Sequence, residues 1–162
     1  MYKEYNIEKL YDQFSRKLYF TSLRIMADTF EAEEAMHDTF LKLHNYHKKH
    51  EIENIESWLT KVCIRISIDR LRKKRELPCA PPPEEEQESS NNQIEKIKGA
   101  ILSLPDGYRL ILTLHLFEGY DYEEIAQITG VKEASVRSQY LRAKKKLAEI
   151  MSDKAKLKSN KE

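Results

Sequence analysis

Several features are scarce in this 162-residue sequence, and each shortage argues against a class of protein. Only four glycines occur, which argues against a glycine-rich phosphate loop and a turn-rich all-β fold. The two cysteines, Cys63 and Cys79, form no CxxC pair, so a disulfide framework or a structural zinc site is not expected. No apolar run approaches the roughly 18 residues of a membrane span, and MYKEYNIEKL lacks a signal-peptide core. We expect a cytoplasmic protein with no direct membrane insertion.

The sequence also lacks an assembled set of catalytic residues. No nucleophile, base and orienting group can be combined, and no nucleotide-binding loop is present, so we expect no enzyme, no cofactor and no small-molecule substrate. His44, His47 and His50 recur every three residues, and a metal site there is conceivable. They lack an apolar partner face and a carboxylate at fixed spacing, so we expect a solvated loop and no metal site here.

The net charge is only +1, but its distribution is uneven. Residues 1–75 carry +3, residues 76–93 carry −5 and residues 94–162 carry +3, so two basic blocks flank an acidic spacer. The bases cluster in the runs RLRKKR and RAKKK. Such clusters can neutralise DNA phosphates, but cations at helix ends also complement the helix dipole, and charge alone leaves both interpretations open.

The first block predicts three helices. Leu10, Phe14 and Leu18 recur every four residues, and a second apolar stripe begins near Glu31. Residues 44–54 are polar and aperiodic, which predicts a loop. The third helix is expected to start after a capping Asn54 and to end in the basic run; its apolar residues are Trp58, Leu59, Val62, Ile66 and Leu71.

The acidic stretch 76–93 contains three consecutive prolines and predicts an extended linker. After it come an apolar helix from Ile94, a turn at Pro105-Asp106-Gly107, and a second apolar helix over 108–117. The chain therefore predicts an all-α fold of two small helical domains on a flexible linker. The expected domains are 1–75 and 94–151, and residues 152–162 are expected to form a basic disordered tail.

Residues 121–147 carry the strongest functional pattern. Asp121 and Glu124 predict a capping box, Gly130 predicts a left-handed turn, and a longer helix follows, which together indicate a helix-turn-helix. If Val136 and Tyr140 face inward, the outward residues suit base edges and phosphates. The candidate duplex-binding residues are Ser135, Arg137, Ser138, Gln139, Arg142, Lys144 and Lys145.

The segment from Leu104 to Leu147 resembles region 4 of the extracytoplasmic-function (ECF) sigma factors of bacterial RNA polymerase, members of the sigma-70 family. The resemblance rests on the Leu-Pro turn, the Arg four residues after the proline, and the Glu-Gly, Glu-Glu-Ile-Ala and Ser-Val elements. EAEEAMHDTFLKLH and SWLTKVCIRISIDRLRKKR resemble region 2 of the same family. Two signatures in the family's order are far more specific than a lone helix-turn-helix.

The resemblance implies an alternative sigma factor that directs core polymerase to promoters and initiates transcription. Region 4 would read the −35 element and contact the β flap. Region 2 would dock on the β′ clamp helices through Glu34, Asp38, Phe40 and Leu41. It would recognise and melt the −10 element through a further set, namely Asn54, Trp58, Lys61, Arg65, Arg70, Arg72 and Lys73. The resemblance also implies an anti-sigma partner.

Two alternatives remain open at this stage. An autonomous helix-turn-helix regulator would bind a symmetric operator tightly without polymerase. A helical adaptor would show no salt-dependent DNA binding at all. Trp58 is itself open between a core anchor and a DNA contact.

Overall fold

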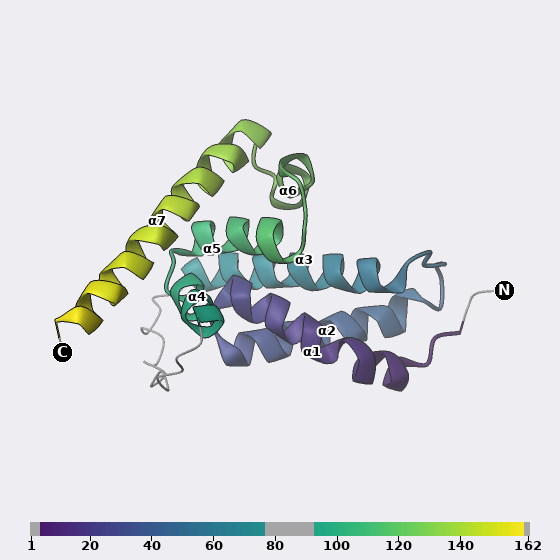
Figure 1. Cartoon of the computed structure of the whole chain (residues 1–162). Helices are drawn as coiled ribbons and strands as arrows, with labels where there is room; N and C mark the ends of the chain where they lie inside the picture. The colour runs from purple at the N-terminus through teal and green to yellow at the C-terminus, as the bar shows by residue number, and fades with distance from the viewer. Residues whose placement is uncertain (1–3, 77–92, 161–162) are drawn as a thin grey trace. The chain divides into compact units, whose positions relative to one another are not determined.

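The computed structural model describes residues 4–76 and 93–160, and these residues form helices joined by short connections (Figure 1). The chain divides into two compact units, one before and one after the segment 77–92. The expected all-α fold of two small helical domains is confirmed. Most of the expected linker, together with Cys79, lies outside the described residues. No helix within the described ranges has the length and apolar character to cross a membrane.

The first unit is a bundle of three helices, each with a polar residue at its N-terminus. These are α1 (Ile7–Met26), α2 (Thr29–Tyr46) and α3 (Ile55–Glu76). Asn6, Asp28 and Asn54 accept backbone hydrogen bonds from the residue three positions on, each across 3.0 Å. Because each cap satisfies a helical N–H that would lack a partner, the caps define where the helices begin.

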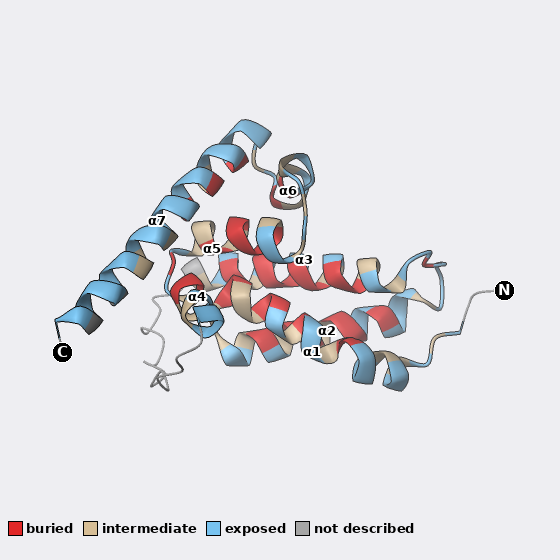
Figure 2. Ribbon diagram, viewed as in Figure 1, coloured by how far each residue is buried: buried red, intermediate tan, exposed pale blue. Residues whose placement is uncertain are grey.

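The core of this bundle lies where one face of each helix meets the other two (Figure 2). Ser22 and Ser67 share a buried hydrogen bond of 2.7 Å, and Ser67 also donates to the Cys63 carbonyl, so these buried hydroxyl groups are paired. The central apolar cluster is Phe14, Leu18, Met36, Phe40, Leu43, Ile52, Leu59 and Cys63.

The second unit contains α4 (Gln93–Leu102), α5 (Asp106–Leu112), a π-helical turn η1 (Thr113–Phe117), α6 (Tyr122–Thr129) and α7 (Glu133–Ser159). The predicted capping box is present: Asp121 accepts from Glu124 N–H, and Glu124 accepts from Asp121 N–H. Gly130 follows α6 with φ +73°, the left-handed conformation expected there. Residues 121–147 therefore form the predicted helix-turn-helix, and its second helix continues to Ser159.

The predicted helix 108–117 differs from the observed one. The chain is helical from Asp106, so Asp106 and Gly107 lie in the first turn of α5 and not in a turn before it. At Thr113 the helix widens, and Glu118 N–H bonds to the Thr113 carbonyl, five residues back. Four consecutive residues, 111–114, are buried. On an ordinary helix, four consecutive side chains point in directions that cover most of the circumference, so they form no single apolar stripe. The spacing of apolar residues therefore does not reveal the π-helical turn.

Two other boundaries are corrected by the structure. The second helix continues to Tyr46, so part of the expected loop at 44–54 is helical. The last helix extends past 151 to Ser159, so most of the expected disordered tail is helical. Residues 152–159 contain neither Pro nor Gly, and Ala, Leu and Lys favour the helix.

Candidate nucleic-acid interfaces

The outward face of α7 carries the residues that the sequence pattern assigns to duplex binding. Ser135, Arg137, Ser138 and Arg142 are exposed, and Gln139 is half-buried. Ala134, Ser135, Ser138, Gln139 and Arg142 line one shallow hollow on this face. Hydroxyl, amide and guanidinium groups therefore lie on one convex helix face, which is a suitable shape and chemistry for a major groove.

The opposite side of α7 explains why this face points outward. Val136, Tyr140 and Ala143 are buried, and α7 packs on α5, α6 and α4. Leu147, expected in the same stripe, is half-buried. Because these residues recur at helical spacing, the positions between them remain open to solvent. Lys144 and Lys145, the other two candidates, are also exposed.

Two aromatic rings lie beneath the cations of α7. The Arg137 guanidinium lies 5.6 Å from the ring centre of Tyr122, and the Lys144 ammonium lies 5.6 Å from that of Tyr140. His115 of η1 stacks on Tyr122 at 5.0 Å and meets Tyr140 edge-on at 4.6 Å. Arg137 also pairs with Glu133 at 3.3 Å on the exposed surface. This aromatic cluster is absent from the sequence-based site, because the spacing of its residues carries no recognisable pattern.

In the first unit, the candidate cations fall into two groups. Lys61, Arg65, Arg72 and Lys73 are exposed on α3. Arg70 instead bridges two carboxylates of α2, at 2.7 Å from Asp38 and 2.9 Å from Glu31. The hydrogen bond to Asp38 raises the pKa of Arg70, partial burial acts against it, and the bond to Glu31 adds to the rise. Arg70 is therefore paired with Asp38, although the sequence analysis places Arg70 in the −10 site and Asp38 in the polymerase-docking site.

Asp28 forms a second link between α2 and α3. It caps α2 and pairs with Lys74 of the basic run. Partial burial alone would raise the pKa of Asp28, but the Glu31 N–H donor and Lys74 outweigh it, and the pKa lies below its ordinary value. Lys74 therefore contributes to the junction between the helices.

An aromatic group gathers where the loop 47–54 joins the helices. Tyr46 packs on Trp58 at 5.1 Å and stacks on His50 at 4.4 Å. Trp58 is half-buried and packs on the apolar core, so it contacts the core and the loop group together. Tyr5 donates to the Ile52 carbonyl at 2.9 Å and ties the loop to the N-terminal segment. Asn54 uses its side-chain oxygen to cap α3.

The candidate docking residues lie along α2. Leu41 is 62% exposed, and Glu34 and Asp38 are half-buried. Phe40 is 6% exposed and belongs to the core cluster. A shallow apolar groove between α1 and α2 is lined by Ile7, His37, Phe40, Leu41 and His44. Phe40 therefore forms the inner wall of this groove, and Leu41 forms its outer edge.

His44, His47 and His50 each contact a neighbouring residue. His47 Nδ1 lies 2.8 Å from the Leu43 carbonyl, and His44 Nε2 accepts from Lys48 at 3.0 Å. His50 stacks on Tyr46. Over residues 4–76 and 93–160, no group of three His, Cys, Asp or Glu residues has the geometry to hold a metal ion.

Two family models match the two units. Residues 10–76 match "Sigma-70 region 2" and residues 94–147 match "Sigma-70, region 4". The ECF RNA polymerase sigma factor SigM of Bacillus subtilis is 26% identical over 150 residues, which cover 87% of this chain and 92% of that protein. SigM of Mycobacterium tuberculosis is 24% identical over 91% of this chain and 78% of its own length.

A solved structure shares the fold. The sigma factor RpoE of Bartonella quintana, crystallised with the anti-sigma factor NepR, aligns with a TM-score of 0.66 and 20% identity. The alignment covers 90% of this chain and 96% of that chain.

Proposed function

Because the chain belongs to the sigma-70 family, as an ECF sigma factor that acts with RNA polymerase, we propose that it directs the polymerase to specific promoters through two DNA contacts. Sigma factors are not enzymes, so the work is done by binding free energy alone. The observation that carries the proposal is the exposed face of α7, where hydroxyl, amide and guanidinium groups cover a shallow hollow. We propose that this face reads the −35 element in duplex form.

The proposed −10 site is on the first unit. Lys61 and Arg65 lie one helical turn apart on α3, and Arg72 and Lys73 extend the exposed basic surface towards its end. Such a row suits the phosphates of a single strand. The aromatic group at the loop lies at the other end of α3, and its rings and Asn54 would receive an unpaired base. Arg70 would act mainly by holding α3 against α2.

The proposed polymerase-docking surface is the groove on α2. Leu41 is a large apolar side chain with little cover, and Phe40 forms the wall behind it. Glu34 and Asp38 supply charge along the same helix. An apolar centre with a charged rim is the usual composition of a protein interface. We propose that the β′ clamp helices bind here, that the second unit contacts the β flap, and that the factor acts in the cytoplasm with the polymerase.

The fold relative described above was crystallised with an anti-sigma factor. We propose that this chain also has such a partner. Such a partner would keep the factor from binding core polymerase. Without polymerase, each unit would offer DNA only a small contact area, so the free protein would bind promoter DNA weakly.

The first test measures binding to core RNA polymerase by fluorescence anisotropy of labelled protein. Leu41→Glu should weaken binding at least tenfold, because it places a charge in the apolar groove. The matched control is Leu157→Glu, since Leu157 is equally exposed, at 64%, near the end of α7. Equal losses in the two variants would contradict the docking surface.

The second test is run-off transcription by the reconstituted holoenzyme on duplexes selected from a randomised promoter pool. Initiation that depends on this chain supports promoter recognition, and permanganate reactivity of thymines reports melting. If the chain fails to bind core but binds a symmetric duplex tightly, it is an autonomous regulator. If the chain binds neither core polymerase nor DNA, the helical-adaptor hypothesis replaces both the sigma-factor and the regulator hypotheses.

A further inference from the structure

His115 stands apart from every residue assigned so far, yet it contacts both helices of the helix-turn-helix. Its ring stacks on Tyr122, the first residue of α6, with an interplanar angle of 22°. It also meets Tyr140, in the middle of α7, at 69°. The two tyrosines are themselves 5.7 Å apart, so the three rings form one cluster. Such ring pairs contribute more than their buried area alone and have preferred orientations.

The π turn places His115 in this cluster. A π-helical turn holds one residue more than an α-turn, so it shifts the register of the residues in it. His115 Nδ1 lies 2.8 Å from the Tyr120 carbonyl, and this carbonyl can only accept, so Nδ1 donates. The hydrogen bond attaches the ring to the segment that leads into α6. His115 therefore lies in an unusual turn and also makes a partly buried hydrogen bond.

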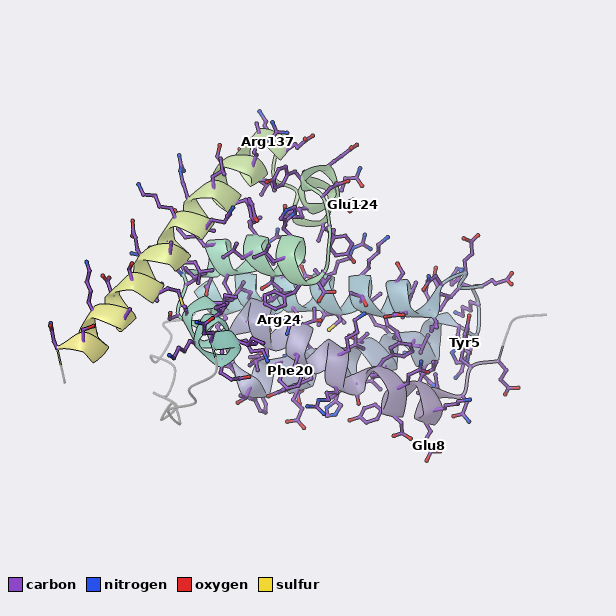
Figure 3. The ribbon with its side chains drawn as sticks, viewed as in Figure 1. Tyr5, Glu8, Phe20, Arg24, Glu124 and Arg137 are labelled. Atoms are coloured by element: carbon purple, nitrogen blue, oxygen red, sulfur yellow. The ribbon has the colours of Figure 1, made fainter. Side chains whose placement is uncertain are left out.

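The two tyrosines that His115 contacts also make cation–π contacts with two basic side chains of α7. Arg137 lies over Tyr122 and Lys144 lies over Tyr140 (Figure 3 shows Arg137 extending from α7). A cation–π contact restrains a cation without neutralising its charge. Arg137 also pairs with the Glu133 carboxylate at 3.3 Å, but both side chains are exposed, so water screens this pair and a DNA phosphate can displace it. The arrangement therefore suits cations that must be both oriented and available.

We propose that His115 is a positioning residue for DNA binding: its ring fixes Tyr122 and Tyr140, and they orient Arg137 and Lys144 toward phosphates. The inference rests on the proposed −35 function, which it deepens. The ring, and not the hydrogen bond, carries the effect, because only the ring contacts both tyrosines. Loss of the ring would leave the two cations present but less ordered.

The first experiment needs no DNA. In the full-length protein, the ¹⁵N heteronuclear NOE of the Arg137 Nε–H reports how ordered that side chain is. It should fall in His115→Ala and in His115→Asn, which keeps an N–H donor for Tyr120 but loses the ring. It should remain near the wild-type value in His115→Phe, which keeps a ring of similar size. Equal values in all four proteins would overturn the proposal.

The second experiment uses holoenzyme and the duplex that wild-type holoenzyme selects from a pool with a randomised −35 element. Each phosphate contact contributes about −0.9 to the slope of log K against log salt concentration. His115→Ala and His115→Asn should therefore flatten the slope by about 1 to 2 and weaken binding about tenfold in low salt. His115→Phe should retain the slope. A variant that merely unfolds loses active protein but keeps the slope, which separates positioning from stability.

The matched control is Leu116→Ala, which changes the neighbouring residue in the same π turn, where the side chain is 53% exposed. It should leave both readouts unchanged. A wild-type slope in His115→Asn, or rescue by Asn and not by Phe, would overturn the role of the ring. If wild-type holoenzyme selects no sequence, the −35 function fails, and the Arg137 measurement still decides whether His115 orders that side chain.

Discussion

Arg70 of α3 donates to the Asp38 carboxylate of α2 across 2.7 Å, although the two residues lie 32 positions apart in the sequence. The same guanidinium also donates to Glu31, so it holds two carboxylates at once. The proposed polymerase-docking helix and the proposed −10 helix are therefore joined by a charged contact. A partner that attracts Asp38 changes what Arg70 can contact, and the two surfaces are not independent.

Removing the Arg70 guanidinium should destabilise the first unit. Arg70→Ala removes the cation that Glu31 and Asp38 share. We expect the free energy of unfolding to fall by about 1 kcal/mol and no more, because these ion pairs are partly exposed and screened by water. Urea denaturation measures it. The control is Lys73→Ala, which removes an exposed cation from the same helix. It should change the free energy of unfolding by about a few tenths of a kcal/mol at most. Equal stability of the two variants would contradict the bridging role.

Two substitutions on the duplex-binding face of α7 should weaken DNA binding in different ways. Arg142→Ala should weaken binding to the selected −35 duplex at least tenfold and relax the base preference, because Arg142 lines the hollow of α7. Lys145→Ala should weaken binding by a similar factor on all sequences and flatten the salt slope by about 1. Competition binding with base-substituted duplexes distinguishes the two. A sequence-independent loss from Arg142→Ala would assign that residue to the phosphates.

Gly130 predicts a stability effect that arises from the backbone alone. Its φ is +73°, and a Cβ built there meets no atom within 4 Å, so Gly130→Ala should lose about 1 kcal/mol through strain only. Gly107→Ala is the matched control: its surroundings are equally open, but it lies in α5 without a positive φ, so Ala should stabilise the helix slightly. Thermal unfolding by circular dichroism should give opposite shifts. If both variants shift the unfolding temperature in the same direction, the proposed strain at Gly130 is contradicted.

The pKa of Asp28 predicts an acid-dependent loss of stability. Since that pKa is lowered from 3.8 in the folded chain, the ionised form contributes stability at higher pH, and the contribution is lost as pH falls below about 4. Asp28→Asn keeps the capping oxygen and removes the charge. At pH 7 the free energy of unfolding of the wild type should exceed that of this variant by well under 1 kcal/mol, because the ion pair is partly exposed and screened by water, and the difference should vanish in acid. Urea titrations across pH measure it, and a constant difference would contradict it.

Some of the fold follows from local sequence. The cap at Asn54, the capping box at Asp121 and the turn at Gly130 were predicted, because each depends on residues within a few positions of one another. The caps at Asn6 and Asp28 were not predicted, although they depend on equally local contacts. The outward face of α7 follows likewise, since helical periodicity alone separates Val136 and Tyr140 from Ser135 and Arg142.

The sequence by itself determined an all-α chain of two units, the helix caps at Asn54 and Asp121, and the exposed face of the last helix, because each of these depends on spacing along a single helix or turn. Only the tertiary structure decided that Arg70 pairs with Asp38, that Phe40 lies in the core while Leu41 is exposed, and that His115 reaches two tyrosines from a π turn. These contacts join residues on different helices. Their geometry is set when the apolar faces pack, and that packing leaves no pattern in the order of the residues.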